Sequence, residues 1–61
     1  MKTGWEFQTL SGDCMGTFNG TLEEAEAEGR NRLAEYRIFN GFRLVMVLPE
    51  GSKILTGYIT K

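Results

Sequence analysis

The residue with the greatest intrinsic reactivity in this sequence is Cys14, which follows Asp13 in the segment SGDC. A nucleophilic cysteine needs a general base or a nearby positive charge that stabilises its thiolate. The chain has no histidine, and no lysine or arginine flanks Cys14. We therefore expect Cys14 to be a small buried or half-buried core residue. We predict no catalytic residue and no enzymatic activity.

Motifs for metals and cofactors do not occur in the sequence either. A single cysteine without histidine excludes a Cys/His zinc site and an internal disulfide. The glycines in GDCMG and FNGT lack the spacing of a phosphate-binding loop. The sequence therefore predicts no metal site and no cofactor.

An acidic run is the remaining cluster of ionisable groups, and it consists of Glu23, Glu24, Glu26 and Glu28. Acidic side chains near the N-terminus of a helix interact favourably with the helix dipole. Glu26 and Glu28 also precede Arg30 and Arg32 by four residues, the favoured spacing for ion pairs on a helix. We expect a solvated helix face. The alternatives are a metal site, a surface that mimics DNA, or an acidic end that steers a partner together with the basic end of the helix.

A length of 61 residues predicts a single domain, residues 1–61, with a small core. Such a chain buries only about 60% of the surface of its unfolded form, and it often depends on a partner chain. The net charge of −1 provides no basic excess that would attract nucleic acid. No segment has the pattern of a secretion signal or the roughly 20 apolar residues of a membrane span, so we expect a cytoplasmic protein.

The first third of the chain has the pattern of a β-hairpin. Alternating residue types over 3–10 are typical of a half-buried strand, and a second strand is expected over 14–19. Between them, Gly12-Asp13 is a two-residue turn signal. That turn would place Phe7 opposite Phe18.

A helix should follow, with Thr21 as its N-cap and Glu24 as the second member of a capping box. Its apolar stripe consists of Leu22, Ala25, Gly29, Leu33 and Tyr36. We expect the helix to end just before Asn40-Gly41. Gly29 and Ala25 form a thin strip, which would let the helix lie close to bulky side chains of the sheet.

The last third predicts a second hairpin, with Pro49 presetting the turn and Gly51 in the left-handed position of a bulge. The expected register places Leu48 opposite Ser52, Met46 opposite Ile54, Leu44 opposite Thr56 and Phe42 opposite Tyr58. The fold class is then α+β in the order ββαββ, an antiparallel sheet of two hairpins with one helix packed on one face.

One helix can cover only one face of this sheet, yet the second hairpin is apolar on both faces. On the uncovered face the predicted register places Val45, Val47, Leu55 and Ile59. Exposed apolar patches usually mark interfaces, so we predict a homodimer, a partner protein or both. The predicted contact residues are Arg43, Val45, Val47, Lys53 and Leu55. The alternative is that the valines occur there only because β-branched residues favour strands. The aliphatic stems of Arg43 and Lys53 would then lie over them.

A basic and aromatic platform for nucleic acid is a weaker possibility. Its members would be Arg43, Lys53, Lys61 and Tyr58. In the predicted register Tyr58 lies on the opposite face from the basic residues, which does not favour stacking of bases beside phosphate contacts.

The pattern of strand, turn, strand, TLEEAEAEG and then GFRLVMVLP resembles the small inhibitors of host RNA polymerase that podophages encode. The resemblance covers roughly residues 5–49 and implies a sheet with one helix and an inhibitory protein contact. The arginines with which that family contacts the polymerase correspond here to Met46 and Leu48, so the resemblance transfers no binding residue. A weaker likeness is to the three-strand-plus-helix domains with which phage integrases bind DNA arm sites.

We therefore interpret the chain as a small non-enzymatic binding protein, encoded by a phage or mobile element, that inhibits or modulates a host protein by direct binding. One alternative is an accessory protein that binds nucleic acid through the sheet and turn loops. Another is a structural homo-oligomeric module. Binding to nucleic acid should weaken steeply as salt rises, whereas apolar docking should not.

Overall fold

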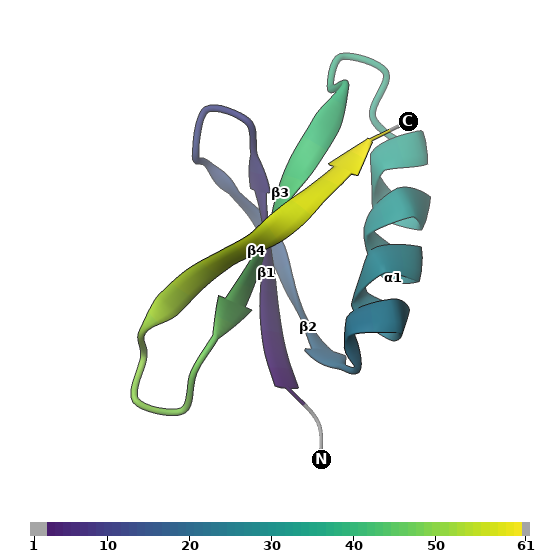
Figure 1. Cartoon of the computed structure of the whole chain (residues 1–61). Coiled ribbons are helices and arrows are strands. Elements are labelled where there is room, and N and C mark those ends of the chain that lie inside the picture. The colour runs from purple at the N-terminus through teal and green to yellow at the C-terminus, as the bar shows by residue number, and fades with distance from the viewer. Residues whose placement is uncertain (1–2, 61) are drawn as a thin grey trace.

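The computed structural model describes residues 3–60 of the chain. Its elements are β1 (Thr3–Thr9), β2 (Cys14–Gly20), α1 (Leu22–Ala34), β3 (Gly41–Val47) and β4 (Lys53–Thr60). Figure 1 shows one sheet with α1 lying along one side of it. The predicted α+β class and the order ββαββ are confirmed.

The four strands form one antiparallel sheet in the order β2-β1-β3-β4. β1 and β3 are central and pair with each other, and they contain most of the buried strand residues. β2 and β4 are the two edges of the sheet, and their residues are mostly exposed or half-buried. The hairpins thus join through their more apolar first strands, because those strands gain most from neighbours on both sides.

The turn of the first hairpin differs from the predicted one. Thr9 accepts a hydrogen bond from the Gly12 amide at 2.9 Å and donates one to the Asp13 carbonyl at 2.8 Å. The loop therefore has three residues, and Gly12, with φ +104°, occupies the left-handed position that ends it. The predicted two-residue turn is wrong, and the register moves by two residues. Phe7 pairs with Gly16 instead of Phe18.

The second hairpin has the predicted turn and half of the predicted register. Gly51 has φ +97°, and Met46 lies opposite Ile54 as expected. The register then shifts between Val45 and Leu44, because Thr56 is an extra residue in β4. Phe42 consequently pairs with Ile59, and the predicted pairs of Phe42 with Tyr58 and of Leu44 with Thr56 are wrong.

The N-terminus of α1 has the predicted capping box. The Thr21 hydroxyl accepts a hydrogen bond from the Glu24 amide at 3.2 Å, and the Glu24 carboxylate accepts one from the Thr21 amide at 2.9 Å. These contacts satisfy two donors at a helix end that would otherwise depend on water.

The C-terminus of α1 lies at Ala34, five residues earlier than predicted. Tyr36 is therefore outside the helix. Its ring lies 5.6 Å from that of Phe39 and 6.3 Å from that of Phe42, between ring centroids. Aromatic and β-branched residues are weak helix formers, so this ring cluster competes successfully with another helical turn.

The core lies between α1 and one face of the sheet, and Phe7, Leu33 and Phe42 are its largest fully buried side chains. The indole N–H of Trp5 donates a hydrogen bond to the Gly20 carbonyl at 2.9 Å. At Gly29 the helix approaches the sheet so closely that a Cβ atom would overlap with Cδ1 of Ile59 and lie 3.0 Å from Cε1 of Phe7. The predicted close approach at Gly29 is confirmed.

Replacing Thr21 by Ala should lower the free energy of unfolding by about 0.5–2 kcal/mol, because the Glu24 amide loses its acceptor. Chemical denaturation monitored by circular dichroism measures this change. Thr21→Ser keeps the hydroxyl and should retain most of the stability. A loss of stability equal in the two variants would contradict the role of the hydroxyl.

Replacing Gly29 by Ala should destabilise the fold, although alanine favours a helix by about 1 kcal/mol. Overpacking against Ile59 costs about 1–3 kcal/mol. Ile59→Val removes the atom that the added methyl group would meet, so the two substitutions should be less costly together than the sum of the single changes. A double-mutant cycle measures this coupling, and additive free energies would contradict the contact.

Candidate functional site

The face of the sheet opposite α1 is the candidate binding surface, and we call it the open face. Side chains alternate between faces along a strand, and Phe7, Phe42, Leu44 and Ile59 belong to the core beneath α1. Their neighbours on the other face define the open face by register. It includes Glu6, Gln8, Cys14, Arg43, Val45, Val47, Lys53, Leu55 and Tyr58.

The structure brings together all five predicted contact residues. Val45 lies opposite Leu55, and Val47 lies opposite Lys53, while Arg43 lies on the same face farther along β3. The register shift at Thr56 changes the rest of the prediction. Ile59, predicted on this face, lies in the core instead.

The shift also moves Tyr58 onto the open face, where it lies directly opposite Arg43. No signal in the sequence marked Tyr58 as a neighbour of Arg43, because the extra residue in β4 reverses the face of every residue that follows it. The predicted separation of the basic and aromatic residues is therefore wrong for Arg43, Lys53 and Tyr58. Lys61, the fourth predicted member, lies outside the described residues.

The apolar residues of the open face differ in exposure. Val45 is only 5% exposed, although α1 lies on the other face, whereas Leu55 is 49% exposed and Tyr58 is 63% exposed. Val45 is thus part of the folded chain's own packing, and the most exposed apolar side chains of the open face, Leu55 and Tyr58, lie on β4.

An ion pair across β3 explains part of the coverage of Val45. Lys53 on β4 reaches Glu6 on β1, with Nζ 3.0 Å from Oε1. Because β3 lies between these strands, the lysine stem crosses β3 on the open face. This geometry matches the alternative interpretation in which a basic side chain covers the valines.

Glu6 is the centre of a small polar network on the open face. Its second carboxylate oxygen accepts a hydrogen bond from the Gln8 amide nitrogen at 2.6 Å, and the Cys14 thiol also contributes a hydrogen bond. The bond from Gln8, followed by the interaction with Lys53, lowers the pKa of Glu6 below its ordinary value of 4.5, while desolvation acts in the opposite direction. Glu6 is therefore held as a carboxylate.

Cys14 lies at the exposed end of this network. The prediction that Cys14 is a core residue is wrong, because the thiol is exposed. The cause is the irregularity of the first hairpin between Phe7 and Gln8, which places Cys14 opposite Gln8 and hence on the open face.

Among the described residues, Arg43 is the cationic group of the open face without a carboxylate partner. Within residues 3–60 the ion pairs use Arg30, Arg32 and Lys53, and Arg43 takes part in none of them. Its Nε atom is buried and has no hydrogen-bond partner in this range. A buried donor without an acceptor costs free energy, so Nε of Arg43 is a local energetic cost of the fold.

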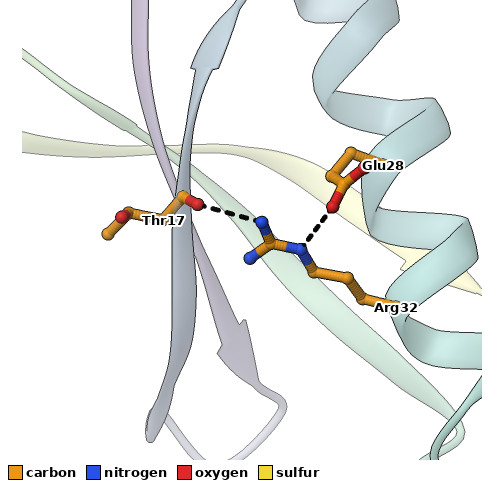
Figure 2. A network of polar contacts seen from close by, with 3 residues as sticks. All are labelled: Thr17, Glu28 and Arg32. Atoms are coloured by element: carbon orange, nitrogen blue, oxygen red, sulfur yellow. Dashed lines mark hydrogen bonds and ion pairs between the residues drawn. The ribbon is translucent and has the colours of Figure 1, made fainter.

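The charged face of α1 has a structural role at the other edge of the sheet. The predicted pairs Glu26–Arg30 and Glu28–Arg32 form, at 3.7 Å and 2.7 Å. Arg32 also donates a hydrogen bond to the Thr17 carbonyl on β2 at 3.1 Å, as Figure 2 shows. Its guanidinium lies 4.9 Å from the ring centroid of Phe7 and passes over Gly16, which has no side chain to obstruct it. Arg32 thereby ties α1 to edge strand β2.

Other kinds of site find little support in the described part of the chain. Residues 3–60 contain no cluster of three or more histidine, cysteine or acidic side chains that could bind a metal ion. The one helix of this range, α1, is too short and too polar to cross a membrane.

Comparison with known proteins found no matching family profile, no matching curated protein and no matching solved structure. The case for a function therefore depends on the geometry of the open face and of the edge strands.

Replacing Glu6 by Gln should destabilise the fold at neutral pH and make its stability less sensitive to acid. The pKa of Glu6 is lower in the folded chain than its ordinary value of 4.5, so its stabilisation is present above about pH 4.5 and is lost as the pH falls through the folded-state pKa. Urea denaturation at pH 7 and pH 3 measures the effect. The difference between wild type and Glu6→Gln should be larger at pH 7.

Glu50→Gln is a suitable control, because Glu50 is exposed in the second turn and forms no ion pair within residues 3–60. This variant should resemble the wild type at both pH values. A difference between wild type and Glu6→Gln that is the same at pH 7 and pH 3 would contradict the role of the ionised carboxylate.

Proposed function

We propose that this chain is a small binding protein that acts by docking onto a partner protein through the open face. The observation that carries the proposal is the position of Arg43, which forms no ion pair within residues 3–60 and lies directly opposite the exposed ring of Tyr58. Arginine and tyrosine are among the residue types most enriched at the energetically dominant positions of protein interfaces.

The partner should present a carboxylate beside an apolar surface. A carboxylate can accept two parallel hydrogen bonds from a guanidinium, and it would compensate the charge of Arg43, which no ion pair within residues 3–60 does. Tyr58 and Leu55 flank Arg43 and Val45 on β4 and would supply the apolar contact. Lys53 would remain at the rim, since its charge is already compensated by Glu6.

The inhibitory part of the proposal is supported by the resemblance to the podophage inhibitors of host RNA polymerase. A protein of this size without catalytic machinery would modulate a host or partner protein in the cytoplasm by covering part of its surface. Since Met46 and Leu48 replace the contact arginines of that family, the resemblance does not specify polymerase as the target.

Nucleic acid is the competing ligand, and the shared location of Arg43, Lys53 and Tyr58 gives it some support. A tyrosine beside basic residues on a sheet can stack a base and contact phosphates. However, Glu6 neutralises Lys53, and the chain as a whole has a net charge of −1. A single uncompensated arginine is a weak footprint for a phosphate backbone, so we favour a protein.

Substitution of Arg43 by Gln should weaken binding to the partner at least tenfold, and Tyr58→Ala should do the same. Residues of this kind typically contribute about 2 kcal/mol or more at an interface. The immobilised chain would first be used to isolate its partner from a bacterial lysate. The affinity of the purified partner for each variant would then be measured by calorimetry at two salt concentrations.

Arg30→Gln is the matched control, because it removes an arginine that is exposed on α1 and away from the open face. It should leave the affinity unchanged. Equal binding by wild type and both open-face variants would contradict the proposed surface. Recovery of nucleic acid, with an affinity that falls steeply as salt rises, would contradict the proposed partner class.

A further inference from the structure

The two edges of the sheet are protected differently. On β2, the carbonyl of Thr17 already accepts a hydrogen bond from Arg32 of α1. On β4, the lysine that could discourage pairing is turned inward to Glu6, and lysines facing outward are a common protection of edge strands. Figure 1 shows β4 crossing the front of the sheet with no other segment in front of it. β4 is therefore the accessible edge.

The hydrogen-bonding pattern identifies which backbone groups of β4 face outward. The Leu48 amide donates to the Ser52 carbonyl at 2.8 Å, which makes that pair a hydrogen-bonded one. Hydrogen-bonded and non-hydrogen-bonded pairs alternate along an antiparallel ladder. This alternation continues along the pairs of β3 and β4 and past the extra residue Thr56. Four residues of β4 then belong to non-hydrogen-bonded pairs, so their N–H and C=O groups point away from β3. They are Lys53, Leu55, Tyr58 and Thr60.

This outward row is symmetric about the bulge. β4 contributes seven cross-strand pairs, and Thr56 is the residue that stands between them without a partner. Counted along β4, the outward-facing residues Lys53, Leu55, Tyr58 and Thr60 belong to the first, third, fifth and seventh of these seven pairs. A second β4 running antiparallel could thus place Leu55 opposite Tyr58 twice and Lys53 opposite Thr60 twice, with bulge opposite bulge. The two lysines would lie at opposite ends and would not repel each other.

The same antiparallel register of two copies would place the exposed Ile54 side chain of one copy beside a hollow of the other copy. Both lie on the face of the sheet that bears α1. Ile54 is 48% exposed. It lies on the face that bears α1, because it is opposite Met46, which packs against the core. In the antiparallel arrangement it would lie beside Ile59 of the other copy. There, Arg30, Leu33, Ala34 and Thr60 line a hollow of about 370 Å³ between the end of α1 and the end of β4.

We propose that two copies of this chain pair through β4 in this antiparallel register and form a continuous eight-stranded sheet. Each outward backbone group gains a partner, each Ile54 enters the hollow of the other copy, and each Leu55 contacts a Tyr58 ring. Such an isologous contact closes after two copies, as two-fold symmetry requires. The open faces of both copies, with both Arg43 side chains, would lie side by side, so pairing is compatible with partner binding and does not depend on it.

The test is the molar mass in solution, measured by light scattering after gel filtration over a range of concentrations. The wild type should have twice the monomer mass of 6.9 kDa. Ile54→Lys should raise the dimer dissociation constant about 10- to 100-fold, because an apolar side chain loses its buried site. Its circular dichroism should match that of the wild type. Ile38→Lys is the control, since Ile38 is 83% exposed outside β4, and it should remain dimeric.

The register itself is tested with cysteines in a Cys14→Ser background. A mixture of Leu55→Cys and Tyr58→Cys chains should form a disulfide-linked pair under oxidation, and Leu55→Cys alone should not. A monomeric wild type at all concentrations would overturn the proposal, as would an Ile54→Lys variant that dimerises as well as the wild type. Arg43→Gln should stay dimeric while losing the partner protein, so failure of pairing and failure of the proposed function are distinguishable.

Discussion

One extra residue in β4, Thr56, determines how the two faces of this sheet are used. Because side chains alternate along a strand, an inserted residue exchanges the faces of everything after it. Ile59 consequently enters the core beneath Gly29, and Tyr58 emerges opposite Arg43. The tight contact of α1, the composition of the open face and the symmetry of the free edge all depend on this one irregularity.

Several charged side chains of this chain are held in ion pairs within the fold. Arg32 connects Glu28 with the Thr17 carbonyl and thereby joins α1 to β2 (Figure 2). Lys53 and Glu6 form a second connection across the open face. What remains uncompensated there, among the described residues, is Arg43, which lies between Gln8 of β1 and Tyr58 of β4. A nearly neutral protein can thus still offer a specific electrostatic contact, because specificity depends on the position of a charge more than on the total.

The core of this chain is small, so the open face and the free edge of β4 remain available for contacts with other chains. With 13 residues, α1 covers only one face of the sheet, and the apolar contact beneath it requires a glycine at position 29. A chain of this size has little further apolar surface to bury within itself. Pairing of β4 would use the backbone edge, Ile54 and the contact of Leu55 with Tyr58. Docking of the open face would use Arg43 and the parts of Leu55 and Tyr58 that remain exposed. The two contacts therefore share Leu55 and Tyr58, and Arg43 belongs to the docking contact alone.

The sequence by itself determined the features that depend on residues close together in the chain. The capping box of Thr21 and Glu24, the turn at Gly51 and the alternation that put Val45 and Leu55 on one face were all predictable, because each depends on local backbone chemistry. The candidate site was predictable to the same extent: its five residues do share a face, but their exposure and the neighbour of Arg43 could not be foreseen.

Only the tertiary structure decided the strand order, the register of the first hairpin, the bulge at Thr56 and the end of α1 at Ala34. Local signals were ambiguous at these points. Gly12 suits two turn types. After Ala34, the three-residue spacing between Leu33 and Tyr36 is also compatible with a longer helix. The choice was made by contacts between distant residues, such as the ring of Tyr36 with that of Phe42 and the approach of Gly29 to Ile59. A single sequence does not reveal those contacts, because their free energy arises only when separate elements pack together.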